Sequence, residues 1–473
     1  MNTTNNVVHD STLTVKSAVS FLISNKGKQL LVHNDYVFKC NKTTPLKRYW
    51  ICTARGCKVC VHTDTQNELL LVNGYHNHAI EPHLLNIKQV KNVMKERILN
   101  ETTSLTKIYD EEVKKACLSA EEIALLPTVV EFRSNMSKAR KKCTPVIPKT
   151  CVFDIPPIYQ ETVSGNRFLL MDYYLKRAKE RVLVFASDAQ LDLLFESDVI
   201  FVDGTFSTAP GIFDQVFIIH VQQFNQGLPV VFCLMPNRRT TTYAELFRRL
   251  KEEAIRNNKT FKPKRVVSDF ELALVAAVRT EFPDSLHSGC NFHFLQAVHR
   301  NIGNLGLASE YKENETIREQ CRQLMALSLM PPSEVEKQFK RIRMISSESL
   351  EDLFIYFQRQ WINGSIPLSL WNANEYDDRT NNVSEAFNRR FGSRIAKKHP
   401  NIWTFIRLIQ DEEVRFQRVF IQLASGATNT KQSTTKTAFQ RRFEVLNIRF
   451  KNGEINSKQL LAGLTSLIGG QKK

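Results

Sequence analysis

Two apolar stretches of the sequence end in an aspartate, a residue that a buried strand normally avoids. In IFVDGTF the apolar residues 200–202 lead into Asp203, and in RVVSDF a shorter run leads into Asp269. Carboxylates at the ends of two neighbouring strands would converge and repel each other unless a cation lay between them. Because magnesium prefers oxygen ligands and tolerates bound water and phosphate, the sequence predicts a magnesium site at this pair.

A third carboxylate follows in TNNVSEAFNRRF, where Glu385 is expected in the first turn of a helix. Phe387 and Phe391 are four residues apart, so they share the inner face of that helix. Each acid taken alone could equally end a solvated strand or helix. Taken together, they could hold Mg²⁺ or Mn²⁺ between them.

Strand and helix patterns alternate around the two aspartates. SDVIFVDGTF precedes two apolar segments, FDQVFIIHVQQF and LPVVFCLMP, and NQG between them is a turn signal. An amphipathic helix, a short strand at 266–268, another helix and a third short strand, SLHSGC, come next. Three antiparallel strands followed by a helix, a strand and further helices predict an α/β chain with a ribonuclease H-like core. In that fold the first and fourth strands are neighbours.

A second chemistry-bearing group lies near the amino terminus, in RYWICTARGCKVC and NGYHNH. Its two thiols and two imidazoles are Cys52, Cys57, His76 and His78. They can close a tetrahedral zinc site, which would stabilise an all-β module of about 60 residues that is short of apolar core. Cys40 and Cys60 are alternative thiolates, and reduced core cysteines beside surface histidines are the interpretation without a metal.

The overall charge points to a polyanionic partner. Lys and Arg number 65 against 48 Asp and Glu, which gives a net charge of +17. Solvated basic faces that bind nothing specific are the alternative. A membrane fits less well, because no apolar run approaches the roughly 20 residues that a spanning helix needs. The first residues, MNTTNNVVHD, resemble no secretion signal, so the ten cysteines are expected to be thiols or metal ligands.

The amino-terminal module resembles the FLYWCH-type zinc finger family over residues 17–80. The matching positions are Phe21, Leu30, Tyr36, Trp50, Cys52, Cys57, His76 and His78. The resemblance implies a small zinc-bound antiparallel sheet that binds double-stranded DNA. Basic residues of the module then become candidate DNA contacts, chiefly to phosphates. These candidates are Lys39, Lys42, Lys47, Arg48, Arg55 and Lys58.

The later motifs resemble the Mutator-like element (MULE) transposase family over about residues 190–410. DGTF, SDFELAL, CNFH and TNNVSEAFN occur in the family's order and at fitting intervals. The resemblance implies that Asp203, Asp269 and Glu385 form a metal-binding DDE triad, with a helical insertion before the third acid. Cys290 and His293 form a C-x2-H pair that the family also has. Structural zinc and local packing are both open roles for this pair.

The expected domains follow from these features. They are a disordered segment (1–16), the zinc finger (17–83), a mostly helical linker (84–189), the first part of the core (190–304), a helical insertion (305–379), the completion of the core (380–410) and a basic helical region (411–473). Trp361 and Trp371 of the insertion could stack on unpaired bases or pack in a core. SKARKKC, residues 137–143, could be a nuclear localisation signal or a solvated linker.

The sequence therefore predicts a nuclear DDE-type DNA transposase that uses zinc for folding and Mg²⁺ or Mn²⁺ for catalysis. Its partners would be the terminal inverted repeats of its element and the target DNA, on which it would assemble as a homo-oligomer. The alternative is a domesticated descendant that binds DNA and regulates transcription without cutting.

Overall fold

The computed structural model describes residues 19–24, 27–101, 103–175, 180–223, 226–375, 382–395, 398–426 and 434–469. The chain forms two compact units, Met1–Pro145 and Val146–Lys473. Each unit has hydrophobic clusters of its own. Among the described residues, no helix is long and apolar enough to cross a membrane.

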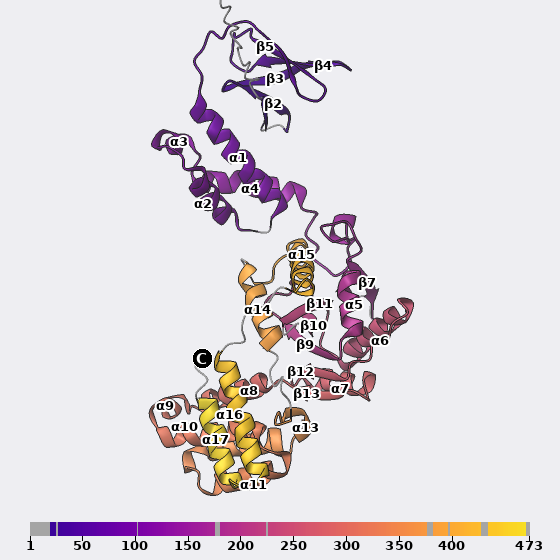
Figure 1. Ribbon diagram of the computed structural model, residues 1–473, viewed down its shortest axis with the longest axis vertical. Coiled ribbons are helices and arrows are strands. Elements are labelled where there is room, and N and C mark those ends of the chain that lie inside the picture. The colour runs from indigo at the N-terminus through magenta and orange to yellow at the C-terminus, as the bar shows by residue number, and fades with distance from the viewer. Residues whose placement is uncertain are drawn as a thin grey trace, which may run out of the picture. The chain divides into compact units, whose positions relative to one another are not determined.

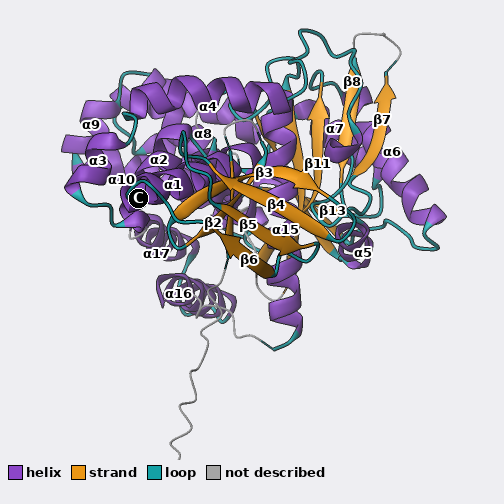
Figure 2. Ribbon diagram, turned by 90° about the horizontal axis from the view of Figure 1, so that it is seen from above, coloured by secondary structure: helices purple, strands orange, loops and turns teal. Residues whose placement is uncertain are grey.

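The first unit opens with an antiparallel sheet whose six strands follow one another in sequence order. Figure 2 draws the strands in orange. The strands are β1 (Ser20–Ile23), β2 (Gln29–His33), β3 (Tyr36–Thr43), β4 (Lys47–Cys52), β5 (Cys60–Asp64) and β6 (Leu69–Asn73). Leu31, Phe38, Trp50 and Val61 form the small core under this sheet. The Trp50 indole donates a hydrogen bond of 3.0 Å to Thr63 Oγ1, so its one polar atom is satisfied although the ring is buried.

Four helices complete the first unit. They are α1 (Pro82–Asn100), α2 (Leu105–Ala116), α3 (Ala120–Leu125) and α4 (Val129–Cys143), and α4 contains the basic segment 137–143. Ser119 and Thr128 open α3 and α4 with capping boxes, so sequence-local hydrogen bonds fix where both helices begin. Met94, Ile98 and Phe132 pack between the helices.

The second unit is built on a seven-stranded sheet in the order β13-β12-β9-β10-β11-β8-β7. The strands are β7 (Leu169–Tyr174), β8 (Arg181–Phe185), β9 (Val199–Thr205), β10 (Gln215–Gln223), β11 (Gln226–Met235), β12 (Arg265–Ser268) and β13 (Leu286–Gly289). β9, β10 and β11 form the predicted antiparallel meander. β12 runs parallel to both β9 and β13. The prediction that the strand carrying Asp203 lies beside the strand that leads into Asp269 is therefore confirmed.

Helices cover both faces of this sheet (Figure 1). On one face α5 (Asp188–Glu196), α6 (Thr240–Arg256) and α7 (Leu272–Glu281) pack on alternate strand residues such as Ile200 and Val202. On the other face α14 (Asn382–Arg394) and α15 (Ile402–Ala424) pack on Ile218 and Phe232. Because side chains alternate along a strand, Asp203 belongs to the face that α14 covers.

The mostly helical linker predicted for 84–189 needs a correction from Val146 onward. Its α-helices α1 to α4 end at Cys143, only a single 3-10 turn (Pro157–Tyr159) precedes the strands, and its second half supplies β7 and β8 at one edge of the large sheet. All five residues of β8 are buried. A short apolar run such as RVLVF shows no period-2 alternation when both faces are covered, so periodicity does not separate it from a buried helix.

The predicted helical insertion joins the carboxy-terminal helices in one core. Its elements are α9 (Ala308–Glu313), α10 (Glu315–Ala326), α11 (Pro332–Met344), α12 (Glu351–Phe357) and α13 (Leu368–Trp371). The preceding helix α8 (Asn291–Asn304) and the carboxy-terminal helices α16 (Thr434–Lys451) and α17 (Ser457–Gly469) pack against them (Figure 1). Trp361 and Trp371 are buried there, and the Trp371 indole donates to the Trp361 carbonyl at 2.8 Å. The structure therefore gives both tryptophans a packing role.

Candidate metal centres

The four predicted zinc ligands converge in the first unit. Cys52 ends β4, Cys57 lies in the loop after it, and His76 and His78 follow β6. One ligand atom from each lies within 4.8 Å of all the others. Cys52 Sγ is 3.2 Å from His78 Nε2, Cys57 Sγ is 3.4 Å from His76 Nδ1, and the two nitrogens are 3.2 Å apart. A tetrahedral zinc site has N–N and N–S edges of about 3.3 and 3.6 Å, so the cluster fits zinc.

Neighbouring groups fix both imidazole rings. His76 stacks on the Tyr36 ring with centroids 3.4 Å apart and an angle of 3° between the planes. His78 Nδ1 lies 3.0 Å from the Ala79 carbonyl oxygen, a contact that assigns the proton to Nδ1 and leaves Nε2 free to bind metal. Burial, followed by the charges of His78 and His33, lowers the pKa of His76, which favours the neutral ring that zinc requires.

The alternative thiols lie outside the cluster. Cys40 is exposed and contacts Thr43, and the nearest polar contact of Cys60 is His62 Nε2 at 3.9 Å. The six candidate DNA contacts lie on β3, β4 and the loop that carries Cys57. Five of them are exposed, and the half-buried Arg48 donates to Asn67 at 2.9 Å. Exposed positions fit phosphate contacts, whereas Arg48 has a structural partner of its own.

The two predicted catalytic aspartates meet at the β9–β12 junction of the second unit. Val267 pairs with Phe201 in parallel register, so continuing the register by two residues brings position 269 level with position 203. Asp203 lies within β9, and Asp269 follows the last residue of β12. The structure thus brings together two acids that are far apart in the sequence.

The electrostatics of this pair disfavour the ionised forms of both acids. Burial, followed by repulsion from Asp269, raises the pKa of Asp203 to about 7. Burial also raises the pKa of Asp269, while a backbone hydrogen bond from Glu271 and the charges of His293 and Arg238 oppose the rise. A buried and a half-buried carboxylate that both resist ionisation form the environment that a divalent cation relieves.

Two residues that support the pair were missed from the sequence. Asn388 of α14 donates a hydrogen bond of 2.6 Å to Asp203 Oδ2 and orients that carboxylate. Glu271, two residues after Asp269, accepts from the Tyr243 hydroxyl at 3.1 Å, and burial followed by the charge of Asp269 raises its pKa. Both lie inside the quoted motifs TNNVSEAFN and SDFELAL, so their spacing from the predicted acids was the available signal.

Gly204 has a steric role next to the first aspartate. A Cβ atom at this position would lie 2.6 Å from Gln215 Oε1. Gln215 is fully buried, and its amide donates to the Tyr243 hydroxyl at 2.7 Å, so it has little freedom to move aside. The glycine of DGTF therefore lets β10 approach the strand that carries Asp203.

The third acid is placed only by its backbone. Glu385 falls in α14, three residues before Asn388, and its side chain lies outside the described residues. Phe387 and Phe391 of the same helix are buried and stack with centroids 5.3 Å apart, as their spacing predicted. The helix is thus anchored on the sheet face to which Asp203 belongs.

Cys290 and His293 begin α8 at the end of β13. The Cys290 amide donates to the Ser268 carbonyl at 2.8 Å, which ties this turn to β12. His293 is near enough to Asp269 for their charges to interact. Within the described part of the chain, the groups that could supply three or more metal ligands do not include this pair.

Comparison with protein families gives two matches. Residues 199–297 match the MULE transposase domain, and residues 21–78 match the FLYWCH zinc finger domain. The first match contains Asp203, Asp269 and the C-x2-H pair, and the second contains all four zinc ligands. No curated protein matches the chain. The two family resemblances predicted from the motifs are confirmed.

Proposed function

Because the chain carries a MULE transposase domain and, before it, a FLYWCH zinc finger, we propose that it is a DDE-type DNA transposase that cuts and joins DNA strands. The observation that carries this proposal is the pair of Asp203, which is buried, and Asp269, which is half-buried, at adjacent parallel strands. Neither acid has an ion pair within the described part of the chain, so two ionised carboxylates would repel each other at a cost that a bound cation removes.

The strand order of the second unit supports a ribonuclease H-like core. An antiparallel meander, β9 to β11, is followed by two parallel strands added on the far side of its first strand. This is the order expected for that fold, in which acids at the first and fourth strands share one edge. β8 and β7 extend the sheet beyond the five core strands.

The residues present fit Mg²⁺ or Mn²⁺. Asp203 and Asp269 supply oxygen ligands, and Glu385 is the third acid of the proposed triad. Positions three apart on a helix share a face, so position 385 is on the same side of α14 as position 388, whose asparagine bonds to Asp203. When bound, two such ions supply an activated nucleophile and stabilise the leaving oxygen of a phosphodiester.

The protein's own groups hold this site ready for metal. The Asn388 amide fixes one oxygen of Asp203, and the backbone amide of Glu271 donates to Asp269 Oδ1 at 3.1 Å. Both hydrogen bonds favour the ionised carboxylates, which are the forms that bind metal. The sheet and α14 exclude bulk water from Asp203, whose exposed fraction is 7%.

The zinc finger binds double-stranded DNA for the proposed enzyme. Its exposed lysines and arginines can contact phosphates of the terminal inverted repeats and of the target DNA. We propose that the protein acts in the nucleus and that it assembles on DNA as a homo-oligomer. The surplus of basic over acidic side chains, +17, favours such a partner.

Nicking of a terminal-repeat duplex in Mg²⁺ or Mn²⁺ tests the proposal, with Ca²⁺ as the inactive control. Asp203→Asn, Asp269→Asn and Glu385→Gln should each abolish cleavage and leave DNA affinity nearly unchanged, because the finger is separate from the acids. Asp198→Asn removes a carboxylate that is 64% exposed just before β9 and should cut normally. Cleavage that survives Asp203→Asn contradicts the proposed triad.

The same assay separates the two leading functions. A wild-type protein that binds the duplex but never cuts it, in either metal, would be the domesticated transcriptional regulator instead.

A further inference from the structure

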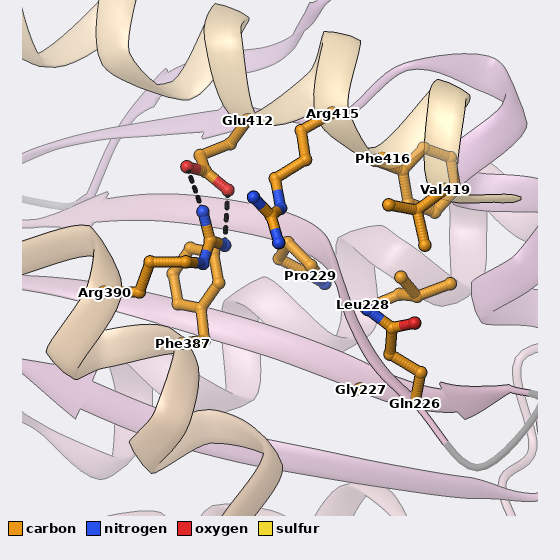
Figure 3. Close-up of a pocket in the computed structure, with 10 residues that line it drawn as sticks. All are labelled: Gln226, Gly227, Leu228, Pro229, Phe387, Arg390, Glu412, Arg415, Phe416 and Val419. Atoms are coloured by element: carbon orange, nitrogen blue, oxygen red, sulfur yellow. Dashed lines mark hydrogen bonds and ion pairs between the residues drawn. The ribbon is translucent and has the colours of Figure 1, made fainter. Parts of the chain in front are cut away.

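A basic pocket lies between α14, α15 and the start of β11 (Figure 3). It has a volume of about 280 Å³, and a neighbouring hollow of about 300 Å³ shares two of its arginines. The charged residues that line the two are Arg390, Arg394, Asp411, Glu412, Arg415 and Arg418. We refer to the two together as the arginine pocket.

Two of the four arginines in the arginine pocket form ion pairs with acidic residues of the same pocket. Glu412 is 1% exposed and accepts two hydrogen bonds from Arg390, of 2.7 and 2.6 Å, and another from Arg394. Arg394 also contacts Asp411 at 3.1 Å. Four arginines against two acids leave the arginine pocket with a net charge of +2.

The surplus charge belongs to Arg415 and Arg418. Neither has a hydrogen bond or an ion pair with another residue that the structure describes, and Figure 3 shows Arg415 beside the Arg390–Glu412 pair without a bond of its own. Arg415 is half-buried. Burial, followed by repulsion from Arg390, lowers the pKa of Arg415. Glu412 attracts Arg415, but this carboxylate is already bonded to Arg390 and Arg394, so repulsion from the other arginines outweighs the attraction. An anionic ligand would relieve the cost of this half-buried cation.

The chemistry of the pocket selects a phosphate. Guanidinium groups match phosphate oxygens with paired, directional hydrogen bonds. The opposite lining is apolar and includes Leu228, Pro229 and Phe416, against which a sugar ring can pack. A backbone phosphate carries one negative charge, which would offset part of the net charge of +2 in the arginine pocket.

The arginine pocket and the acid pair lie on the same sheet. On β10, Val221 lies opposite Leu228 of the pocket, and Ile218 lies opposite Asp203. Three residues along a strand, together with the two strand spacings between β9 and β11, place Leu228 about 14 Å from Asp203. α14 links the two places, because Asn388 bonds to Asp203 and Arg390 lines the pocket. A DNA strand at the acid pair can therefore reach the arginine pocket with a phosphate a few nucleotides away.

We propose that the arginine pocket binds a backbone phosphate of a DNA strand and positions that strand for reaction at Asp203 and Asp269. This inference rests on the proposed function. It adds a phosphate site in the second unit to the DNA contacts of the finger.

The salt dependence of DNA affinity tests the inference on the full-length protein. Each phosphate contact contributes about −0.9 to the slope of log K against log salt. Arg415→Gln and Arg418→Gln should each make the slope shallower, and the double variant, which loses the whole contact, should make it shallower by about 0.9. Arg256→Gln is the matched control, because it removes an exposed arginine from α6, on the opposite face of the sheet. Slopes identical to that of the wild type in both pocket variants would overturn the inference.

Folding of the variants is checked by melting temperature. Arg415→Gln should melt at the same or a higher temperature, because it removes a cation that its neighbours repel. Because Arg418 is exposed, Arg418→Gln should not disturb folding. If Arg415→Gln melts at a lower temperature than the wild type, Arg418→Gln alone still tests the pocket.

A second arm uses inorganic phosphate as the probe. Millimolar phosphate should raise the melting temperature of the wild type more than that of Arg415→Gln. If phosphate distinguishes the two proteins while their DNA salt slopes agree, the site takes free phosphate and the assignment to DNA is wrong. If the pocket variants have shallower salt slopes than the wild type but the wild type never cuts DNA, the phosphate site stands and the transposase proposal is wrong. The two proposals can therefore fail separately.

Discussion

Replacing Asp203 by Asn should stabilise the protein when Mg²⁺ and Mn²⁺ are absent. The folded pKa of this carboxylate is about 7, against about 3.8 in the unfolded chain, because burial and Asp269 disfavour its charge. Below pH 4 both states are protonated and the group costs nothing. As the pH rises from about 4 to about 7 the unfolded state releases the proton first, so the folded state loses stability across this window. Above pH 7 the cost is complete.

The size of the effect follows from the shift. A difference of about 3 pKa units corresponds to about 4 kcal/mol at pH 8. The side-chain amide that Asp203→Asn introduces keeps an acceptor oxygen for Asn388, so the substitution removes the charge without removing the hydrogen bond. For a unit of roughly 300 residues this should raise the melting temperature by about 6 °C at pH 8. The gain should vanish near pH 4.

Differential scanning calorimetry of wild type and variant at pH 4, 6 and 8 measures this difference, in buffers freed of Mg²⁺ and Mn²⁺. Asp198→Asn removes an exposed carboxylate paired with Lys264 and should change stability by less than about 1 kcal/mol at every pH. A variant that melts lower than wild type at pH 8 would show that Asp203 is a structural carboxylate, and the argument for a metal site would fail.

Two further substitutions have matched controls. Cys57→Ser should leave the chain without bound zinc, whereas Cys60→Ser should keep one zinc per chain, because only Cys57 belongs to the four-ligand cluster. Mass spectrometry of the bound metal measures the zinc content of both variants. Equal zinc contents would contradict the ligand assignment. Gly204→Ala should cost about 1–3 kcal/mol in urea unfolding, because its Cβ would lie 2.6 Å from Gln215 Oε1. Gly211→Ala meets no atom within 4 Å and should unfold like the wild type; a Gly204→Ala variant that does the same would refute the steric role.

The sequence was most informative where chemistry and local pattern coincided. Asp203 and Asp269 could be paired in advance because acids at the ends of apolar runs are costly, and a meander followed by a helix and a strand brings such ends together. The zinc ligands could be identified because few arrangements of two thiols and two imidazoles suit a module so small.

Other features depend on tertiary packing that no local pattern records. The strand Arg181–Phe185 is buried on both faces, so its composition does not show whether it is a strand or a helix. The arginine pocket combines residues from α14, α15 and β11, and only their packing reveals that Arg415 forms no ion pair with a residue that the structure describes. Asn388 belongs to the motif TNNVSEAFN, but its hydrogen bond to Asp203 forms only because α14 packs on the sheet face that carries Asp203.

The central claim is that Asp203 and Asp269 bind a divalent cation, and anomalous diffraction from a crystal grown with Mn²⁺ tests it most directly. The zinc ion expected at Cys52, Cys57, His76 and His78 provides an internal control for metal detection. The account predicts a manganese peak within coordination distance, about 2.1 Å, of carboxylate oxygens of both aspartates, and its loss in Asp203→Asn. A clear zinc peak with no manganese at the aspartates would contradict the account.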